Sequence, residues 1–359
     1  MLDFACGLYL GFGHPAGTLR SWLRLTTGVP AALAEPPGAA ELGRRLAGLT
    51  ACEAGVVAPS TLHVFFDLIE ALRPAHGTIY LGAEAYPLAR WGVERGVARG
   101  ARVRGVRHDD PDDLRALLRR ARDAKPPLVV LDGVCVDCGG PTPLAAHAEL
   151  VAQRGGVLVV DDTQGLGIFG GNPSAAQPWG TGGGGTAAWH GLERHPSVLL
   201  ASSLAKAFGA PIAALSGPRR QVARYLRSSD LRVHASPPSA AAIEAGRSAL
   251  DLNEREGEVR RLRLQRNIRL FRDGAAALGL EPRGGLFPVQ SLARVGPLDA
   301  REAHTALNGR GIRTVLRGGR RARALTVVIR ATHRPSDLRR LLLALESCLV
   351  RPPLRATAR

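Results

Sequence analysis

Four apolar residues lead directly into two carboxylates in the segment Val157-Leu158-Val159-Val160-Asp161-Asp162-Thr163-Gln164-Gly165. A short run of branched apolar residues that ends in polar and glycine residues is typical of a strand buried on both faces of a parallel sheet. Such sheets bind ligands outside the carboxyl ends of their strands. The sequence therefore predicts that Asp161 faces a ligand-binding crevice. A metal or phosphoryl site, or a carboxylate that only caps a turn, are the alternatives.

Comparable apolar runs occur elsewhere in the first part of the chain, at residues 78–81, 103–106, 128–131 and 198–200. Helical periodicity separates them, at residues 62–72, 111–122 and 144–154. Alternating strands and helices predict an α/β fold with a mostly parallel central sheet. Residues 170–196, which include four consecutive glycines at 182–185, are expected to form a flexible surface loop.

The last part of the chain has a different order of elements. A long helix is predicted from about residue 239 to 278, then strands at 289–295 and 324–329, and a final helix at 336–349. We therefore expect an N-terminal arm at 1–45, a large domain at 46–247 and a smaller C-terminal α+β domain at 248–359. The tail at 351–359 is expected to fray.

One lysine stands out because lysine is so rare here. Of the 48 basic side chains only Lys125 and Lys206 are lysines. Lys206 follows the apolar run at 198–200, where the carboxyl end of another buried strand is expected. Arginine stays protonated, whereas a lysine can lose its proton and form a Schiff base. Lys206 is therefore a candidate for chemistry, and an ordinary surface lysine is the alternative.

A third feature is Ser60-Thr61, directly before the predicted helix 62–72. Hydroxyls, free backbone N–H groups and the positive end of the helix dipole together suit a phosphate, although a plain N-cap is the commoner role of such a serine. An amine, a buried carboxylate and a phosphate cradle are what pyridoxal 5'-phosphate needs. The ordered set of Ser60, Asp161 and Lys206 therefore indicates this cofactor.

Longer segments resemble a known family, the α-oxoamine synthase branch of the fold-type I pyridoxal-phosphate enzymes, in the aminotransferase class I/II superfamily. It includes 8-amino-7-oxononanoate synthase and 2-amino-3-ketobutyrate CoA ligase. Residues 160–170 resemble the family's VDDAHSTGVLG, and residues 203–209 resemble TLSKALG. Residues 131–144 resemble DGVFSMDGDIAPL, residues 107–114 resemble RHNDLDDL, and Ala331-Thr332-His333 resembles a conserved AAH of the small domain.

The resemblance implies a fold-type I pyridoxal-phosphate transferase that forms a homodimer with its sites at the interface. It also implies roles for particular residues. Lys206 would form the Schiff base and move a proton at the substrate α-carbon, and Asp161 would pair with the pyridine nitrogen. Ser203 would contact the phosphate, with Ser60 and Thr61 in the phosphate loop. The N-terminal arm would lie over the active site.

Two departures from the family concern the cofactor ring. Gln164 replaces the family's histidine after the acidic pair, so it can donate a hydrogen bond to the cofactor's 3-oxygen but cannot titrate. Tyr86 stands at the position of the histidine that stacks on the ring, and an aromatic face can still stack there. A tyrosine of the hydrophobic core is the alternative for Tyr86.

A third departure concerns the substrate. The family's carboxylate-binding arginine aligns with Thr326, so the usual bidentate clamp is missing from its place. Arg330 lies four positions further along the chain, just after the predicted strand at 324–329. A basic loop precedes that strand, with Arg317, Arg320, Arg321 and Arg323. These arginines are alternative anion contacts, or only a solvated surface. Either the carboxylate is held differently, or the substrate is not an ordinary α-amino acid.

Composition limits the other classes of function. The net charge of +17 raises the possibility of a basic nucleic-acid-binding protein on a retired enzyme fold, but no nucleic-acid motif accompanies it. No apolar run is long enough to span a bilayer, and the start does not resemble a signal peptide, so no membrane association and a cytoplasmic location are expected. The lone Cys135-Val136-Asp137-Cys138 could be a zinc or redox site, although a structural role is favoured, and no metal is expected.

Together these features predict a pyridoxal-phosphate-dependent transferase that acts on an amine or amino acid, with a role in a specialised biosynthetic pathway. The favoured reaction is acyl transfer with C–C condensation, in which a Lys206 aldimine leads to a quinonoid that attacks an acyl thioester. An aminotransferase on the same fold is the alternative, and a cofactor-bound but inactive partner subunit is another.

Overall fold

The computed structural model describes residues 1–73, 77–107, 110–121, 125–318 and 323–349. The chain forms two compact units. The larger unit contains Phe12–Cys135 and Pro141–Glu258, and the smaller unit contains Met1–Gly11, Val136–Gly140 and Val259–Arg359. The expected division at residues 45 and 247 stays a prediction, as does the separate arm. The expected fraying at 351–359 lies outside the described residues.

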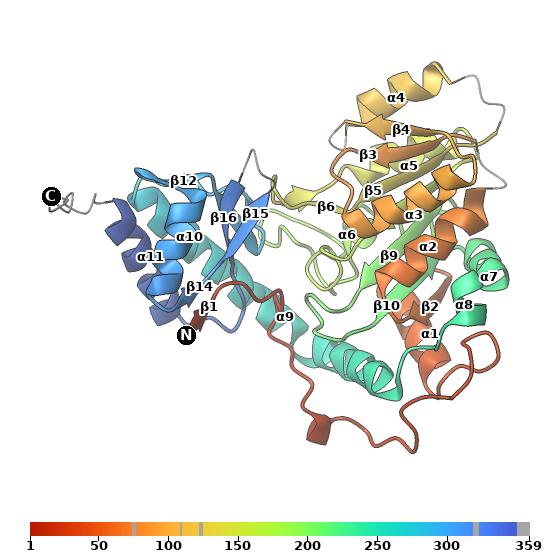
Figure 1. Ribbon diagram of the computed structural model, residues 1–359, viewed down its shortest axis with the longest axis horizontal. Coiled ribbons are helices and arrows are strands. Elements are labelled where there is room, and N and C mark those ends of the chain that lie inside the picture. Colours follow the sequence, from red (N-terminus) through yellow and green to blue (C-terminus); the bar gives the residue numbers. More distant parts are fainter. Residues whose placement is uncertain (74–76, 108–109, 122–124, 319–322, 350–359) are drawn as a thin grey trace, which may run out of the picture. The chain divides into compact units, whose positions relative to one another are not determined.

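The larger unit is built on a seven-stranded sheet (Figure 1). β10 runs antiparallel to both of its neighbours, and the pairs among β9, β8, β5, β3 and β4 are parallel. The predicted α/β fold with a mostly parallel sheet is therefore confirmed. In sheet order the strands are β2 (Ala54–Ala58), β10 (Ala213–Gly217), β9 (Val198–Ser203), β8 (Val157–Asp161), β5 (Leu128–Asp132), β3 (Ile79–Gly82) and β4 (Val103–Val106).

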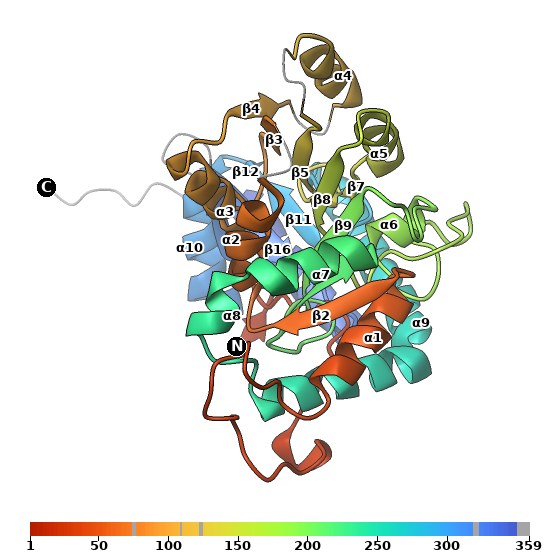
Figure 2. The same ribbon diagram turned by 90° about the vertical axis from the view of Figure 1, so that its right-hand side faces the viewer.

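Helices cover both faces of this sheet, which is why its central strands are apolar at successive positions. Val129 and Val130 are neighbours on β5 and both fully buried, yet they pack into different hydrophobic clusters, one on each face. Full burial of a valine side chain is worth roughly 1.5–3 kcal/mol. One cluster includes residues of α2 (Thr61–Leu72), α3 (Pro87–Ala98) and α7 (Arg219–Ser228), and the other includes residues of α4 (Pro111–Arg119), α5 (Leu144–Ala152) and α6 (Thr186–Trp189) (Figure 2).

The outer elements of the larger unit were harder to predict. The helix expected at 111–122 ends at Arg119, after a start at which the Asp110 side chain accepts a hydrogen bond from the amide of Asp112. Two strands, β2 and β10, were not predicted, because their alanine, glycine and serine residues do not form a clear apolar run. The remaining elements described in this unit are η1 (Ala16–Thr18), α1 (Ala39–Leu49), α8 (Asp230–His234) and β6 (Val134–Cys135).

The expectation of a surface loop at 170–196 is wrong for much of this segment. Trp179 is only 2% exposed and packs edge-on against Phe169, with ring centroids 6.3 Å apart. The residues from Gly183 to Ala188 are buried, and the last of them begin α6. The glycines let the backbone approach other backbone closely: a Cβ on Gly184 would lie 2.4 Å from the Leu49 carbonyl oxygen. Gly184 and Gly185 therefore serve close packing, whereas Gly182 is exposed and a Cβ there would meet nothing within 4 Å.

The smaller unit contains a three-stranded antiparallel sheet in the order β11 (Val289–Leu292), β16 (Arg323–Val328) and β15 (Val315–Gly318). β1 (Leu2–Asp3) pairs in parallel with β14 (Ile312–Arg313), so the first residues of the chain belong to this unit. The predicted long helix is confirmed as α9 (Ala240–Ala277), of which the part from Val259 onward lies here. Other elements of this unit are β12 (Arg294–Val295), β13 (Leu298–Asp299), α10 (Ala300–Gly309) and α11 (Pro335–Leu349). β7 (Gly140–Pro141) has its first residue in this unit and its second in the larger unit.

Among the described helices, none combines the length and the apolar character that crossing a bilayer requires.

Candidate active site

The strand ends of the larger unit bring most of the predicted site residues to one edge of the sheet. Ala213 of β10 pairs with Ala58 on one side and with Ser203 on the other. The carboxyl ends of β2 and β9 therefore lie in one row, and Ser60 and Thr61 come directly after β2. Ala201 of β9 pairs in turn with Asp161 at the end of β8. Because neighbouring strands lie about 4.8 Å apart, the ends of β9 and β8 are adjacent.

Asp161 is a buried carboxylate with an incomplete set of partners. It is 6% exposed, and its Oδ1 accepts a hydrogen bond from the amide of Thr163 at 3.1 Å. Burial raises the pKa of the Asp161 carboxyl, while hydrogen bonds from the side chain and backbone of Thr163 lower it. No arginine, lysine or histidine within the described ranges forms an ion pair with it, although the chain is rich in arginine. The position therefore suits a cation that the protein itself does not supply.

Lys206 lies in the turn that follows β9. The turn is shaped by two backbone bonds, from the Leu204 amide to the Ile212 carbonyl and from the Ala210 amide to the Leu204 carbonyl. Lys206 is half-buried, and its amine forms no hydrogen bond or ion pair with any residue that the structure describes. This amine is therefore free to react with a ligand that enters at the sheet edge.

The N-terminal segment that belongs to the larger unit contacts the same turn. His14 Nε2 lies 2.8 Å from the carbonyl oxygen of Phe208, two residues after Lys206, and can donate a hydrogen bond to it. Phe12 stacks on Phe208, with ring centroids 6.4 Å apart and planes 11° from parallel. Residues 12–14 thus hold the Lys206 turn in place from outside the sheet.

Ser203 has a hydroxyl that remains able to donate. Its Oγ accepts a hydrogen bond from the Ala205 amide at 3.2 Å, which uses a lone pair and not the hydroxyl proton. Its own amide donates to the Thr163 hydroxyl at 3.0 Å. Ser203 can therefore donate to an anion at the carboxyl end of β9.

The start of α2 has free donors. Ser60, its N-cap residue, is extended at φ −159° and makes no side-chain capping bond to the helix. Instead its Oγ lies 2.9 Å from Nδ1 of His63, whose pKa is lowered chiefly by burial. Because the serine hydroxyl is turned to His63, the first amides of α2, including that of Thr61, have no side-chain cap. Uncapped amides and the helix dipole favour a bound phosphate.

Tyr86 and Gln164 are the two predicted ring contacts. Tyr86 is 55% exposed, so it is not the core tyrosine considered as an alternative. Its amide donates to Oδ1 of Asp132 at 3.3 Å, and Asp132 is the register partner of Asp161. Tyr86, at the start of α3, therefore lies next to the end of β5, and β5 is the neighbour in the sheet of β8, which ends at Asp161. Gln164 is half-buried in the turn three residues after Asp161.

Asp162, the second acid of the pair, faces away from this edge into a small polar cluster. Its carboxylate accepts hydrogen bonds from the Thr186 hydroxyl at 2.7 Å and the Thr186 amide at 3.0 Å. Burial raises the pKa of the Asp162 carboxyl to about 7, against the effect of these two bonds. A Cβ on Gly165 would lie 2.1 Å from its Oδ1, so any larger residue here would force the carboxylate or the turn to move. Asp162 therefore ties the turn after β8 to α6.

The predicted substrate contacts belong to the smaller unit. Thr326 is 2% exposed, and its hydroxyl lies 2.9 Å from that of Ser291, its register partner on β11. Arg330 donates from Nη2 to the Asp3 carbonyl at 3.0 Å, and its Nε is buried without a partner. Arg317 of the basic loop forms an ion pair with Asp137, while residues 320 and 321 lie outside the described ranges. A substrate role for Thr326 and Arg330 stays a prediction.

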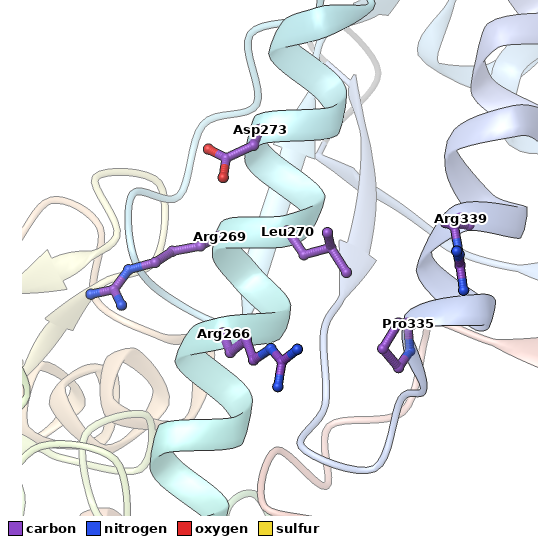
Figure 3. A pocket seen from close by; sticks show the side chains of 6 residues that line it. All are labelled: Arg266, Arg269, Leu270, Asp273, Pro335 and Arg339. Atoms are coloured by element: carbon purple, nitrogen blue, oxygen red, sulfur yellow. The ribbon is translucent and has the colours of Figure 1, made fainter.

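The smaller unit also has a basic groove of about 410 Å³, between α9 and α11. Figure 3 shows Arg266 and Leu270 of α9 directed toward Pro335 and Arg339, while Arg269 extends from the other side of α9. The three arginines are exposed, and none of them forms an ion pair within the part of the chain that the structure describes. The groove contains none of the predicted cofactor residues. Its lining is Arg266, Arg269, Leu270, Asp273, Pro335 and Arg339.

The cysteines do not form the zinc site that was considered. Cys135 and Cys138 are both disulfide-bonded, so neither offers a thiolate to a metal ion. Cys6, Cys52 and Cys348 are free. In the described ranges no three histidine, cysteine or acidic side chains come together as metal ligands.

Three residues of the site were missed from the sequence. Asp132 binds the Tyr86 amide, His63 engages the Ser60 hydroxyl, and Thr163 contacts both Asp161 and Ser203. Of these three, only Thr163 could have been noticed from the sequence, because this chain has threonine where the family segment VDDAHSTGVLG has alanine. The partners of Asp132 and His63 depend on side-chain directions that a motif does not report.

Comparisons with known proteins agree on one family. The model of the family "Aminotransferase class I and II" matches residues 92–342. The 8-amino-7-oxononanoate synthase of Chromohalobacter salexigens is 31% identical over 316 residues, which cover 86% of this chain and 77% of the relative. That of Alkalilimnicola ehrlichii is 34% identical over 259 residues, covering 70% of this chain and 62% of the relative. The chain thus spans less than two-thirds of some relatives' length.

Solved structures share the fold. Serine palmitoyltransferase from S. paucimobilis, solved with a bound PLP-myriocin aldimine, has a TM-score of 0.82 at 18% identity over 96% of this chain and 86% of that chain. The 8-amino-7-oxononanoate synthase of Francisella tularensis has a TM-score of 0.71 at 17% identity over 97% of both chains. The fold is therefore that of the fold-type I transferases, as predicted from the sequence.

Proposed function

Because this chain belongs to the aminotransferase class I and II family, we propose that it is a pyridoxal-phosphate-dependent acyltransferase of the α-oxoamine synthase type. It would join the α-carbon of an amine or amino acid to the acyl group of a thioester. The observation that carries the proposal is that two groups follow neighbouring strands at one sheet edge: the buried Asp161 carboxylate, which has no cationic partner among the described residues, and the Lys206 amine, which has no hydrogen-bond or ion-pair partner among them.

The residues at this edge fit the cofactor at three points. Asp161 would hold the protonated pyridine nitrogen, which supplies the positive charge that its burial calls for. Lys206 would hold the aldehyde carbon through its free amine. Ser203, with its available hydroxyl proton, and the uncapped amides at Thr61 would hold the phosphate. Pyridoxal phosphate, when bound, supplies an electron sink for a carbanion formed at the substrate α-carbon.

The remaining steps fall to side chains of this chain. Lys206 would be the base that removes the α-proton of the substrate and later returns a proton. Gln164 would donate a hydrogen bond to the 3-oxygen of the ring, and its amide does not change charge with pH. Tyr86 offers an aromatic face to the ring. His14 and Phe12 contact Phe208 and would thereby help to keep the turn that carries Lys206 in place.

Thr326 of the smaller unit bears on which acyl acceptor the protein uses. Thr326 offers one hydroxyl, which it already shares with Ser291, so no bidentate clamp on a carboxylate is available at this position. We propose that the acceptor is an amine or amino acid whose carboxylate, where present, is held by another group. We also propose that the protein forms a homodimer and that its reaction belongs to a biosynthetic pathway.

The test is an assay of the purified protein supplied with pyridoxal phosphate, a panel of amines and amino acids, and an acyl-coenzyme A. Free thiol would be measured with a thiol reagent, and condensed products by mass spectrometry. We expect thiol release only when both substrates are present. Keto-acid-dependent conversion of the amine without thiol release would instead identify an aminotransferase, and absence of both activities from a protein that binds no cofactor would reject the proposal.

A further inference from the structure

The positive charge of this chain is concentrated in its last part. Residues 259–359 contain 22 arginines, no lysine and six acidic residues, and thus carry +16 of the net charge of +17. The residues before them contain 26 basic and 25 acidic side chains. A bias in overall composition would spread the excess along the whole chain, whereas here the excess belongs to the smaller unit. Charge gathered in this way attracts anions to that unit.

The basic groove between α9 and α11 lies within the smaller unit. Arg266, Leu270 and Asp273 are four and three positions apart, so they share one face of α9. Opposite them lie Pro335, the first residue of α11, and Arg339, about one turn further along it (Figure 3). Each wall of the groove therefore contributes an arginine. The volume of about 410 Å³ is that of a small-molecule site.

The arginines of this groove have no counter-charge in the part of the protein that the structure describes. Arg266 and Arg339 are exposed, and neither forms an ion pair there. Asp273, the acidic residue of the lining, does not pair with them either. Arg247 of the larger unit, in contrast, has its Nη1 2.7 Å from Oε2 of Glu41. Two cations that border one space repel each other, and an anion bound between them is attracted by both.

The chemistry of the lining indicates which anion fits. Guanidinium groups bind phosphate in a bidentate manner, and the start of α11 adds the positive end of a helix dipole. Leu270, which is 37% exposed, and Pro335 offer apolar surface beside the two arginines. The Asp273 carboxylate would repel a second anionic group but would accept hydrogen bonds from hydroxyls. A ligand with one phosphate, an apolar ring and hydroxyl groups therefore matches the groove.

A mononucleotide has these features, whereas a nucleic-acid strand fits less well. None of the six lining residues is aromatic, so successive bases would have no ring in the groove on which to stack. Asp273 also places a negative charge where a continuous phosphate backbone would need positive charge. The lining therefore favours a single nucleotide over a polymer.

We propose that the groove between α9 and α11 binds a mononucleotide. Its phosphate would lie between Arg266 and Arg339, its base or sugar against Leu270 and Pro335, and a sugar hydroxyl would donate to Asp273. None of the proposed cofactor residues lines this groove, so the site goes beyond the proposed function and its occupancy can be measured without an activity assay. Coenzyme A also carries a nucleotide, but its additional phosphates would be repelled by Asp273.

The experiment measures binding to the full-length protein saturated with pyridoxal phosphate, so that the proposed cofactor site is occupied. AMP, adenosine, inorganic phosphate and coenzyme A are titrated by isothermal calorimetry at constant ionic strength. The variants are Arg266→Gln, Arg339→Gln and Asp273→Asn. Arg340→Gln is the matched control, because it removes the same charge from an exposed residue beside Arg339 that does not line the groove.

We expect AMP to bind the wild type, inorganic phosphate to bind more weakly, and adenosine to show no binding. Arg266→Gln and Arg339→Gln should each weaken AMP binding about tenfold or more, which corresponds to the loss of one charge-assisted hydrogen bond. Arg340→Gln should change AMP binding by less than about twofold, because its charge is screened by solvent. Coenzyme A should bind the wild type more weakly than AMP, and Asp273→Asn should narrow this difference.

Several results would overturn the proposal. One is a wild type that binds AMP no more tightly than Arg266→Gln and Arg339→Gln do. Another is an equal loss in Arg340→Gln, which would mean that only the net charge matters. Tighter binding of coenzyme A than of AMP would reject a singly phosphorylated ligand. Salt-dependent binding of a single-stranded oligonucleotide, tighter than that of AMP and lost in the same variants, would assign the groove to nucleic acid instead.

Discussion

Asp132 and Asp161 are register partners at the carboxyl ends of β5 and β8, yet their surroundings give them different tasks. Asp132 accepts a hydrogen bond from the Tyr86 amide and so places the start of α3. Asp161, one strand away, is buried and has no cationic partner within the described residues. The fold therefore gives Asp132 a fixed structural partner, whereas we expect Asp161 to pair with a cationic ligand.

Lys206 is predicted to be the residue to which the cofactor becomes attached. Borohydride treatment of the holoenzyme, followed by peptide mass spectrometry, should find the reduced cofactor on the peptide that contains Lys206. Lys125 is the internal control, because it is the only other lysine of the chain. Lys206→Arg should keep the fold but lose the visible absorption band, since a guanidinium stays protonated. Label on Lys125, or on both lysines equally, would contradict the assignment.

Asp161→Asn is predicted to have opposite effects on activity and on apoprotein stability. A neutral amide cannot pair with a protonated pyridine, so kcat should fall by about 100-fold or more. Burial raises the pKa of Asp161, so the ionised carboxylate is a cost to the folded apoprotein above its unfolded pKa. The variant should therefore unfold at a higher urea concentration than the wild type at pH 8. Asp132→Asn, as the control, should not gain stability.

Asp162 is predicted to make the apoprotein less stable as the pH rises. Its pKa is raised from 3.8 to about 7 in the folded protein. Between these values the folded chain holds a proton that the unfolded chain has lost, so the free energy of unfolding falls with increasing pH, by up to about 4 kcal/mol. Asp162→Asn should flatten this dependence, as measured by urea unfolding between pH 4 and pH 8. An unchanged slope would show that Asp162 titrates normally.

Thr326 and Ser291 are predicted to be coupled. Each hydroxyl is the partner of the other, so Thr326→Val should leave a buried hydroxyl unsatisfied and cost roughly 1–3 kcal/mol of stability. The double variant with Ser291→Ala should be less destabilised than the sum of the single variants. Urea unfolding of the four proteins gives the coupling energy. If the two destabilisations simply add, the interaction between the hydroxyls contributes nothing to stability. An increase in KM for Thr326→Val, without one for Ser291→Ala, would indicate that Thr326 also contacts the substrate.

Gly165→Ala is predicted to damage the turn that carries Gln164. The new Cβ would lie 2.1 Å from Oδ1 of Asp162, so this carboxylate or the turn must move, at a cost of about 2 kcal/mol or more. Gly105→Ala is the matched control, because a Cβ there meets nothing within 4 Å. Thermal unfolding should separate the two variants clearly, and equal melting temperatures would mean that the turn can relax without loss.

Much of the fold could be read from local patterns. The central strands were visible because burial on both faces demands apolar residues at every position, as in the run from Val157 to Val160. β10 was not visible, since its alanine, serine and glycine residues resemble a loop until they pair with β2 and β9. The buried part of the segment at 170–196 was misread for a similar reason: glycine marks both flexible loops and close packing.

The sequence by itself determined the chemical groups of the site and their order, because a carboxylate and a lysine that each follow a buried parallel strand must reach the same edge of the sheet. The tertiary structure decided which of these groups were already engaged. It turned the Ser60 hydroxyl to His63, gave Asp162 to Thr186, and placed Thr163 between Asp161 and Ser203. These partnerships depend on side-chain direction, and two of them join residues 24 and 40 positions apart that meet only after the sheet has formed.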